Sequence, residues 1–127
     1  MKLENIRDML ADVLNISDVH MAKLPDTAGN NSICVYTSKH THTYRQCIGN
    51  TKAHDYYYIT ILLHGNQSPR QTESWARQIF DTVRCIKDYQ TQEGTVKFIL
   101  PTYDLQDVGT DDAGIYEQVI ETAVIYQ

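Results

Sequence analysis

Two histidines one residue apart are the side chains of this sequence best suited to binding a metal. His40 and His42 would point to the same side of an extended segment, because side chains alternate along a strand. Together with His54, His64 or Cys47 they would supply three of the four ligands that zinc takes. None of these candidates stands at a zinc-motif spacing. We therefore expect solvated histidines at a hairpin tip and predict no metal or other cofactor.

Five carboxylates near the C-terminus form the second group that could bind a cation: Asp104, Asp107, Asp111, Asp112 and Glu117. A calcium-binding EF-hand loop needs glycine at its sixth position, and counting from Asp107 places Asp112 there. Gly109 and Gly114 instead suit the positive φ angles of a turn before a final strand. The pattern favours an acidic loop over a calcium site.

Catalytic motifs are missing from the sequence. It contains no GxSxG, no HExxH, no phosphate-binding loop and no deaminase-type His and Cys pair. His64 follows an expected strand, which is a common position for a catalytic histidine, but the sequence identifies no partner for it. We predict that the chain is not an enzyme.

The net charge, the apolar runs and the cysteine content argue against further classes of protein. The 127 residues carry a net charge of −5, which argues against nucleic-acid binding, although Lys39–His42 with Arg45 could form a small basic patch. No apolar run approaches 18 residues and the N-terminus is charged, so we expect neither a membrane span nor export. The three cysteines are expected to be reduced, with Cys34 and Cys85 in the core.

The elements that would position these groups can be predicted from periodicity. Apolar residues recur at helical spacing over 3–14, and a second helix begins at Ser68-Pro69 and ends before Asp88. β-branched and aromatic residues predict strands at 32–37, 44–48 (weak), 56–63, 96–100 and 115–126, with a loop at 102–114. We therefore predict a single domain, 1–127, with an α+β fold. Its elements follow the order α-β-β-β-α-β-β, and its two helices pack on a single mixed or antiparallel sheet.

Several segments, taken in order, resemble the minor capsid and tail-terminator (tail-completion) proteins of tailed phages. The shared features are the N-terminal helix, Leu24-Pro25-Asp26, Ile33–Tyr36, Tyr57–Leu62, the helix with Ala76, Ile79, Phe80 and Asp81, and Pro101. The most specific feature is D-x-G-x-D-x-x-G-x-Y-E, which runs from Asp107 to Glu117. The sequence departs from the family at Ser38-Lys39-His40, where members often have glycines.

The resemblance implies a structural role in the virion, with assembly in the host cytoplasm. Such proteins form a ring, commonly a hexamer, that caps the head-proximal end of the tail tube, so the implied partners are further copies of the chain, the tail-tube protein and the head connector. A closing ring needs two different complementary surfaces. We expect the polar segments 37–55 and 102–114 to supply contacts, through Lys39, His40, His42, Tyr44, Arg45, Tyr103, Asp107, Asp111 and Asp112.

Three alternatives stay open at this point. The chain could be another head–tail joining protein. It could be a small ligand-binding or enzymatic domain, in which Trp75 and the tyrosines would line a deep pocket beside His64, His54 or the acidic loop. It could also be a metal-dependent adaptor that uses His40 and His42.

Overall fold

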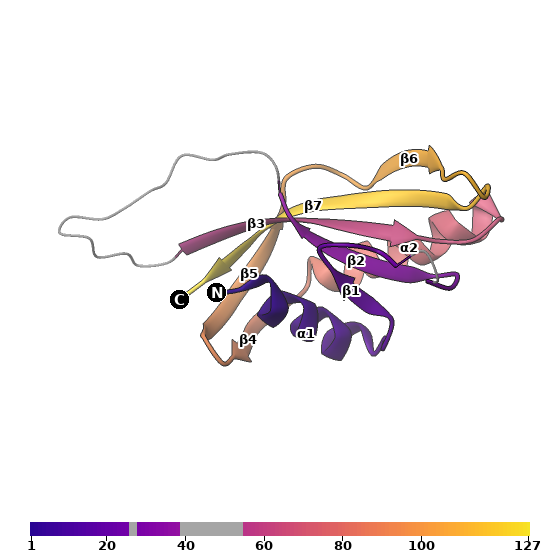
Figure 1. Cartoon of the computed structure of the whole chain (residues 1–127). Helices are drawn as coiled ribbons and strands as arrows, with labels where there is room; N and C mark the ends of the chain where they lie inside the picture. The colour runs from indigo at the N-terminus through magenta and orange to yellow at the C-terminus, as the bar shows by residue number, and fades with distance from the viewer. Residues whose placement is uncertain (26–27, 39–54) are drawn as a thin grey trace.

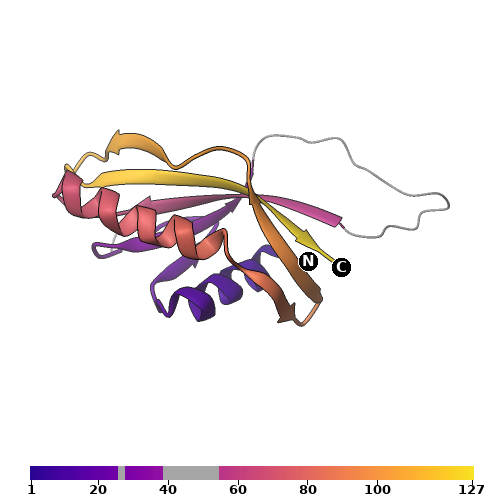
Figure 2. The ribbon, with the colours of Figure 1, turned by 180° about the vertical axis from the view of Figure 1, so that it is seen from behind.

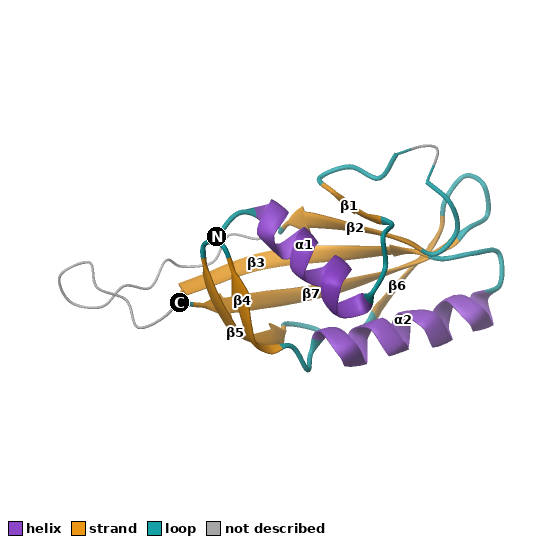
Figure 3. Cartoon of the chain, turned by 90° about the horizontal axis from the view of Figure 1, so that it is seen from below, coloured by secondary structure: helices purple, strands orange, loops and turns teal. Residues whose placement is uncertain are grey.

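A single mixed sheet, with both helices on one of its faces, organises the chain (Figures 1 and 3). The structure is a computed structural model that describes residues 1–25, 28–38 and 55–127. Its elements are α1 (Leu3–Leu14), β1 (Val19–Met21), β2 (Ser32–Thr37), β3 (Asp55–His64), α2 (Pro69–Val83), β4 (Lys87–Thr91), β5 (Gly94–Pro101), β6 (Gln106–Thr110) and β7 (Tyr116–Tyr126). The predicted α+β class, with one mixed sheet and two helices, is confirmed.

The strands are ordered β1-β2-β3-β7-β5-β4, and β6 also pairs with β7. β1 and β2 are parallel, whereas all other pairs are antiparallel. β7 pairs with β3 along its length, from His64 opposite Glu117 to Asp55 opposite Tyr126. Its other edge is shared by β5 and β6. Along residues 116–119 of β7, β6 is therefore the outermost strand of the sheet. Along residues 122–126, the sheet continues through β5 to β4.

The core lies between the sheet and the two helices. Alternate residues of β3, namely Ile59, Ile61 and Leu63, are fully buried, as strand periodicity requires for one covered face. They pack with the buried stripes of α1 (Ile6, Met9, Leu10) and α2 (Ala76, Ile79, Phe80, Val83). Seen from behind, α2 runs along the sheet beneath β7 (Figure 2). Neither helix of the described residues has the length and hydrophobicity to cross a membrane.

The C-terminal end of α1 and the N-terminal end of α2 lie at the residues that the sequence predicts. Asn15 closes α1 with a left-handed φ of 54°. Ser68 caps α2, since its hydroxyl accepts the backbone N–H of Gln71 (3.3 Å), and Pro69 is the first helical residue. Cys34 is buried as predicted, but the prediction for Cys85 was wrong. α2 ends at Val83, so Cys85 falls in the exposed turn before β4.

Three strands, β1, β4 and β6, were missed by the sequence prediction. Each is a short edge strand, and β4 (KDYQT) and β6 (QDVGT) hold mostly polar residues, so neither shows the apolar alternation of a half-buried strand. Part of the predicted loop 102–114 is therefore the strand β6. The weak strand predicted at 44–48 lies outside the described residues.

Two bulges interrupt the pairing along the edge of β7 that β5 and β6 share. Two residues of β5 oppose one of β7 between Val96 and Phe98, and the same happens in β6 between Asp107 and Gly109. β7 itself pairs with β3 without interruption.

Gly65, which joins β3 to the start of α2, gives a test of this packing. A Cβ at Gly65 would collide with the side chain of Thr72, which is fully buried. We expect Gly65→Ala to lower the free energy of unfolding by about 1–3 kcal/mol, measured by urea denaturation. In a Thr72→Ala background the added cost of Gly65→Ala should be smaller, and equal costs in the two backgrounds would contradict the collision.

Tyr89 gives a pH test, because its hydroxyl donates a 2.7 Å hydrogen bond from β4 to Asp12 of α1. This bond raises the pKa of Tyr89 to about 12. The folded state thus holds the phenol proton more tightly than the unfolded state, whose tyrosine pKa is about 10. The contribution is complete below about pH 10 and is lost as the pH rises toward 12. Tyr89→Phe should reduce the fall in stability between pH 10 and 12, and an unchanged slope would refute the link.

Candidate assembly interface

The face of the sheet opposite the helices exposes large apolar side chains. Phe98 and Leu100 of β5 are 50% and 53% exposed, whereas the intervening Ile99 is buried in the core. Phe98 lies opposite Ile125 of β7, and Leu100 lies opposite Ala123. These pairs place both exposed side chains on the face that neither helix covers.

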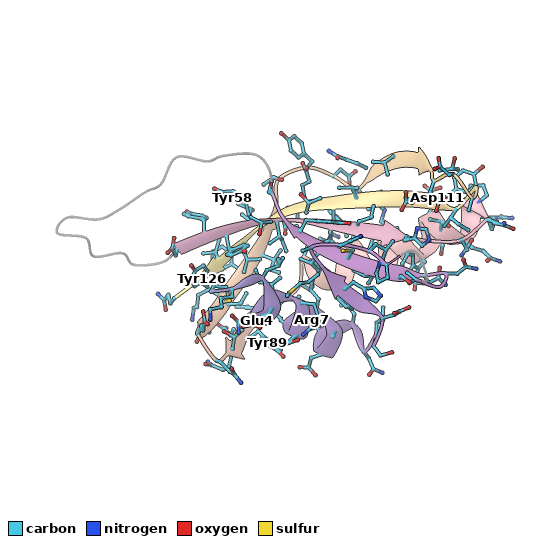
Figure 4. The ribbon with its side chains drawn as sticks, viewed as in Figure 1. Glu4, Arg7, Tyr58, Tyr89, Asp111 and Tyr126 are labelled. Carbon is cyan, nitrogen blue, oxygen red and sulfur yellow. The ribbon has the colours of Figure 1, made fainter. Side chains whose placement is uncertain are left out.

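Two tyrosines of β3 extend this exposed surface across β7. Tyr56 lies opposite Ile125 and Tyr58 opposite Ala123, and the two rings stack with centroids 6.1 Å apart. Figure 4 shows Tyr58 on the side of the sheet away from α1. We name this surface the open-face patch; it comprises the exposed Phe98 and Leu100 and the partly exposed Tyr56 and Tyr58, which lie on either side of the buried Ala123 and Ile125. Tyr57, between the two, packs against the core instead. An exposed apolar surface of several side chains is typical of a binding surface.

A second surface follows β5 along the chain. Tyr103 is 56% exposed and Val108, the extra residue of the β6 bulge, is 52% exposed. Asp107 and Asp112, in the same stretch of chain, are exposed as well. We name these four residues the β6 edge. Three of them, Tyr103, Asp107 and Asp112, were predicted contact residues, and all three are exposed.

Asp111, the fourth predicted contact residue of this region, has a local structural role. Its Oδ1 accepts the backbone N–H groups of Ala113 and Ile115, both at 2.9 Å. Asp107 Oδ1 likewise accepts the N–H of Gly109. Gly109 and Gly114 have φ angles of 90° and 81°, as the sequence predicted. The Asp107–Glu117 motif therefore shapes a bulge and a tight turn.

His64 acquires the partner that the sequence could not identify. Its Nδ1 lies 2.9 Å from Glu117 Oε2 and 3.8 Å from Asp111 Oδ2, and the residue is only 8% exposed. The β3–β7 register sets His64 directly opposite Glu117. An imidazole bonded to a carboxylate is suited to acid–base chemistry. Here the contact also ties the turn that Asp111 shapes to the end of β3.

The described residues also line three surface hollows, one of which includes Asp107 of the β6 edge. One of 320 Å³ separates α1 from β4, one of 550 Å³ lies between the ends of α1 and α2, and one of 190 Å³ lies between α2 and β6. Neither His64 nor Trp75 lines any of the three. Within the described ranges no group of three or more His, Cys, Asp or Glu side chains is arranged to hold a metal ion. These three hollows do not join the His64 pair to a pocket of the kind that the enzymatic alternative requires.

The remaining predicted contact residues, Lys39, His40, His42, Tyr44 and Arg45, lie outside the described residues. Sequence reasoning missed Phe98, Leu100 and Val108. In the sequence, Val96, Phe98 and Leu100 alternate as if they shared one buried face. The bulge after Val96 reverses the facing of the two later residues, and the sequence carries no clear signal for it.

Comparison with known proteins gives a match at the level of fold. No protein-family model matches this chain, and no curated relative does. Among solved structures it is similar to a chain of the "virion of native gene transfer agent (GTA) particle", with a TM-score of 0.58 and 12% identity. The match covers 93% of this chain and 84% of that chain. At this identity the likeness shows a shared fold over nearly the whole length.

The His64 contact can be tested by removal. His64→Ala removes the imidazole that lies 2.9 Å from the partly buried carboxylate of Glu117, whereas Asp111 keeps its two backbone N–H donors. We expect a loss of about 2–3 kcal/mol in the free energy of unfolding. His20→Ala is the matched control, because the His20–Asp18 pair has the same 2.9 Å contact but its partner carboxylate is about half exposed. Equal costs for both variants would show that the His64 contact does not stabilise the turn.

Proposed function

We propose that this chain is a structural protein of a phage-type virion, and specifically a tail terminator. It would act as a ring of identical copies that caps the head-proximal end of the tail tube and meets the head connector. The main support is the fold shared over 93% of the chain with a chain of a gene transfer agent virion. The Asp107–Glu117 motif, which the structure shows to be a bulge and turn anchored at His64, adds to this support.

The open-face patch gives the proposed assembly its driving force. Full burial of a side chain such as Phe or Leu is worth about 1.5–3 kcal/mol, so covering the exposed halves of Phe98 and Leu100 would contribute about 1 kcal/mol each. That is too little to hold two copies together alone. It becomes effective when several interfaces form at once around a ring or on a tube end.

The proposed ring would need more than one contact surface on each copy. A closed ring with more than two members uses heterologous contacts, in which one patch meets a different patch of the next copy. The open-face patch is apolar and aromatic, whereas the β6 edge is acidic and lies toward the opposite end of β7. The two surfaces are chemically unlike, so each would need its own complementary surface on the next copy, on the tube or on the connector.

Tube capping tests the proposal. Tail-tube protein from the same genome would be polymerised with and without this chain, and tube lengths and ends would be compared by electron microscopy. The wild-type chain should shorten the tubes and add density at one end. Tubes of unchanged length with bare ends would overturn the proposed function.

The contribution of the patch can be measured in the same assay. Phe98→Ser/Leu100→Ser should fold with nearly wild-type stability, because both side chains are half exposed, yet should cap tubes at least tenfold less effectively. Gln78→Ser, on the exposed side of α2, is the control and should cap normally. Normal capping by the double variant would exclude the open-face patch from the interface.

A further inference from the structure

The smallest of the three hollows, of 190 Å³, is enclosed by three elements of the chain. One wall is formed by residues of α2 at a spacing of four, Pro69, Glu73 and Arg77, which therefore share one side of that helix. The remaining lining comes from β7 and from the chain that enters β6. α2 and β6 flank the same end of β7 (Figures 1 and 2). The hollow is thus built from segments that are distant in sequence.

Gln118 of β7 is the buried polar residue of this hollow. It lies opposite Leu63 of the core, so its side chain is on the helix side of the sheet. Gln118 is only 8% exposed, yet the structure shows no hydrogen bond for its side-chain amide to any described residue. Buried polar groups in proteins are normally hydrogen-bonded, and an unpaired one costs stability. Since Gln118 lines the hollow, a ligand bound there would supply the missing partner.

The charges around the hollow favour a cation. Glu73 is exposed and forms no ion pair with the described part of the chain. Asp107 uses one carboxylate oxygen to accept a backbone N–H and leaves the other for a ligand. Arg77 is already paired with Asp104 at 3.0 Å and lies 5.6 Å from the centre of the Phe80 ring. Two carboxylates are therefore left without a counter-ion, and they would attract a cation and repel an anion.

The size and the donor set of the hollow indicate which cation. Pockets for small molecules usually enclose about 300–1,000 Å³, so 190 Å³ suits a single side chain better. Calcium and magnesium need six or more oxygen ligands, and no cluster of three His, Cys, Asp or Glu side chains stands among the described residues. A guanidinium group offers five N–H donors on a plane that is weakly hydrated. Arginine therefore fits better than lysine, whose ammonium group holds water more strongly.

We propose that the hollow between α2 and β6 binds the guanidinium group of an arginine presented by the tail-tube protein. Glu73 and Asp107 would neutralise its charge. The side-chain carbonyl of Gln118 and the hydroxyl of Tyr116, which also lines the hollow, would accept its other N–H groups. The choice of partner rests on the proposed function, because a tail terminator has to engage the tube in order to act.

The chain's own described arginines are poor candidates for this role. Arg7, Arg84 and Arg77 each pair with a carboxylate of the same copy, at 2.8, 3.1 and 3.0 Å. Arg70 has no such pair among the described residues, but it adjoins Pro69, which lines the hollow. Its entry into the hollow of a second copy would bring two hollows face to face. That is a two-fold contact, which does not extend into a ring.

Binding of a single arginine tests the site in the full-length chain. N-acetyl-L-arginine methylamide would be titrated into isotope-labelled protein, and the side-chain amide signal of Gln118 would be followed by NMR. That signal should shift and saturate. The neutral analogue N-acetyl-L-citrulline methylamide should bind at least about tenfold more weakly, because it lacks the charge, and the lysine counterpart should also bind more weakly. No shift of the Gln118 signal, or equal binding of either control compound, would overturn the inference.

Removal of the two charges tests the carboxylates. Glu73→Gln/Asp107→Asn keeps the shapes of both side chains and an amide oxygen that can still accept the N–H of Gly109. This variant should bind the arginine compound and cap tubes at least about tenfold less effectively. Glu4→Gln/Asp112→Asn is the matched control, since it removes the same charge from exposed residues that do not line the hollow. Equal effects of the two double variants would refute the site.

Gln118→Met separates binding from folding. Methionine is unbranched and of similar size, and it removes an amide that has no partner. The midpoint of urea denaturation should therefore stay the same or rise, while binding of the arginine compound falls at least about tenfold. A lower midpoint would show that the amide serves the fold, and unchanged binding would show that it does not touch the ligand. Either result contradicts the proposal.

Self-association and capping separate this inference from the proposed function. Glu73→Gln/Asp107→Asn should associate with itself like the wild type in light scattering. Loss of self-association, or normal capping by this variant, would overturn the assignment of the arginine to the tube. If the wild type caps tubes but the arginine compound does not bind, the tail terminator stands and the site is wrong. If the compound binds at Gln118 and the chain never caps tubes, the guanidinium site is real and the proposed function is wrong.

Discussion

The antiparallel pairing of β7 with β3 is the constraint on which the rest of the structure depends. It runs the full length of β3, and it fixes which residues of both strands face the helices. Because strand periodicity is two, a slip of one residue would turn Ile59, Ile61 and Leu63 out of the core. The same register sets His64 opposite Glu117 and Tyr58 opposite Ala123. One set of backbone hydrogen bonds therefore builds the core, anchors the acidic turn and assembles the open-face patch.

The strongly patterned parts of this fold could be predicted from the sequence, because a buried stripe leaves a local signal. The first helix, the strand at 32–37 and the capped start at Ser68 follow from residue spacing alone. The short edge strands β4 and β6 could not be predicted in this way. Each forms a hairpin with the strand that follows it, but both are mostly polar and show no apolar alternation. The exposure of Cys85 could not be predicted from residue spacing either. It depends on α2 ending at Val83, two residues before Cys85.

The residues of the candidate interface also differ in whether the sequence could identify them. Tyr103, Asp107 and Asp112 could be identified as surface residues because they stand in a polar, glycine-containing segment. Phe98 and Leu100 could not, because one bulge decides whether β5 presents them to the core or to the outside. Asp111 was predicted as a contact residue but spends one oxygen on the N–H groups of Ala113 and Ile115, while the other faces His64. The sequence would be the same whether Asp111 contacted a partner or bonded the turn, so only the three-dimensional structure distinguishes the two roles.

The bulge of β6 bears on how an assembly of these chains would end. A flat, unpaired sheet edge accepts further strands without limit, and proteins prevent this with short strands, bulges and charges. β6 has all three features: it is five residues long, it bulges at Val108, and it carries Asp107 beside that bulge. Such an edge resists open-ended strand addition while its side chains stay exposed. The proposed tail terminator would need this property, because a surface that bound another copy indefinitely would extend the polymer that it has to end.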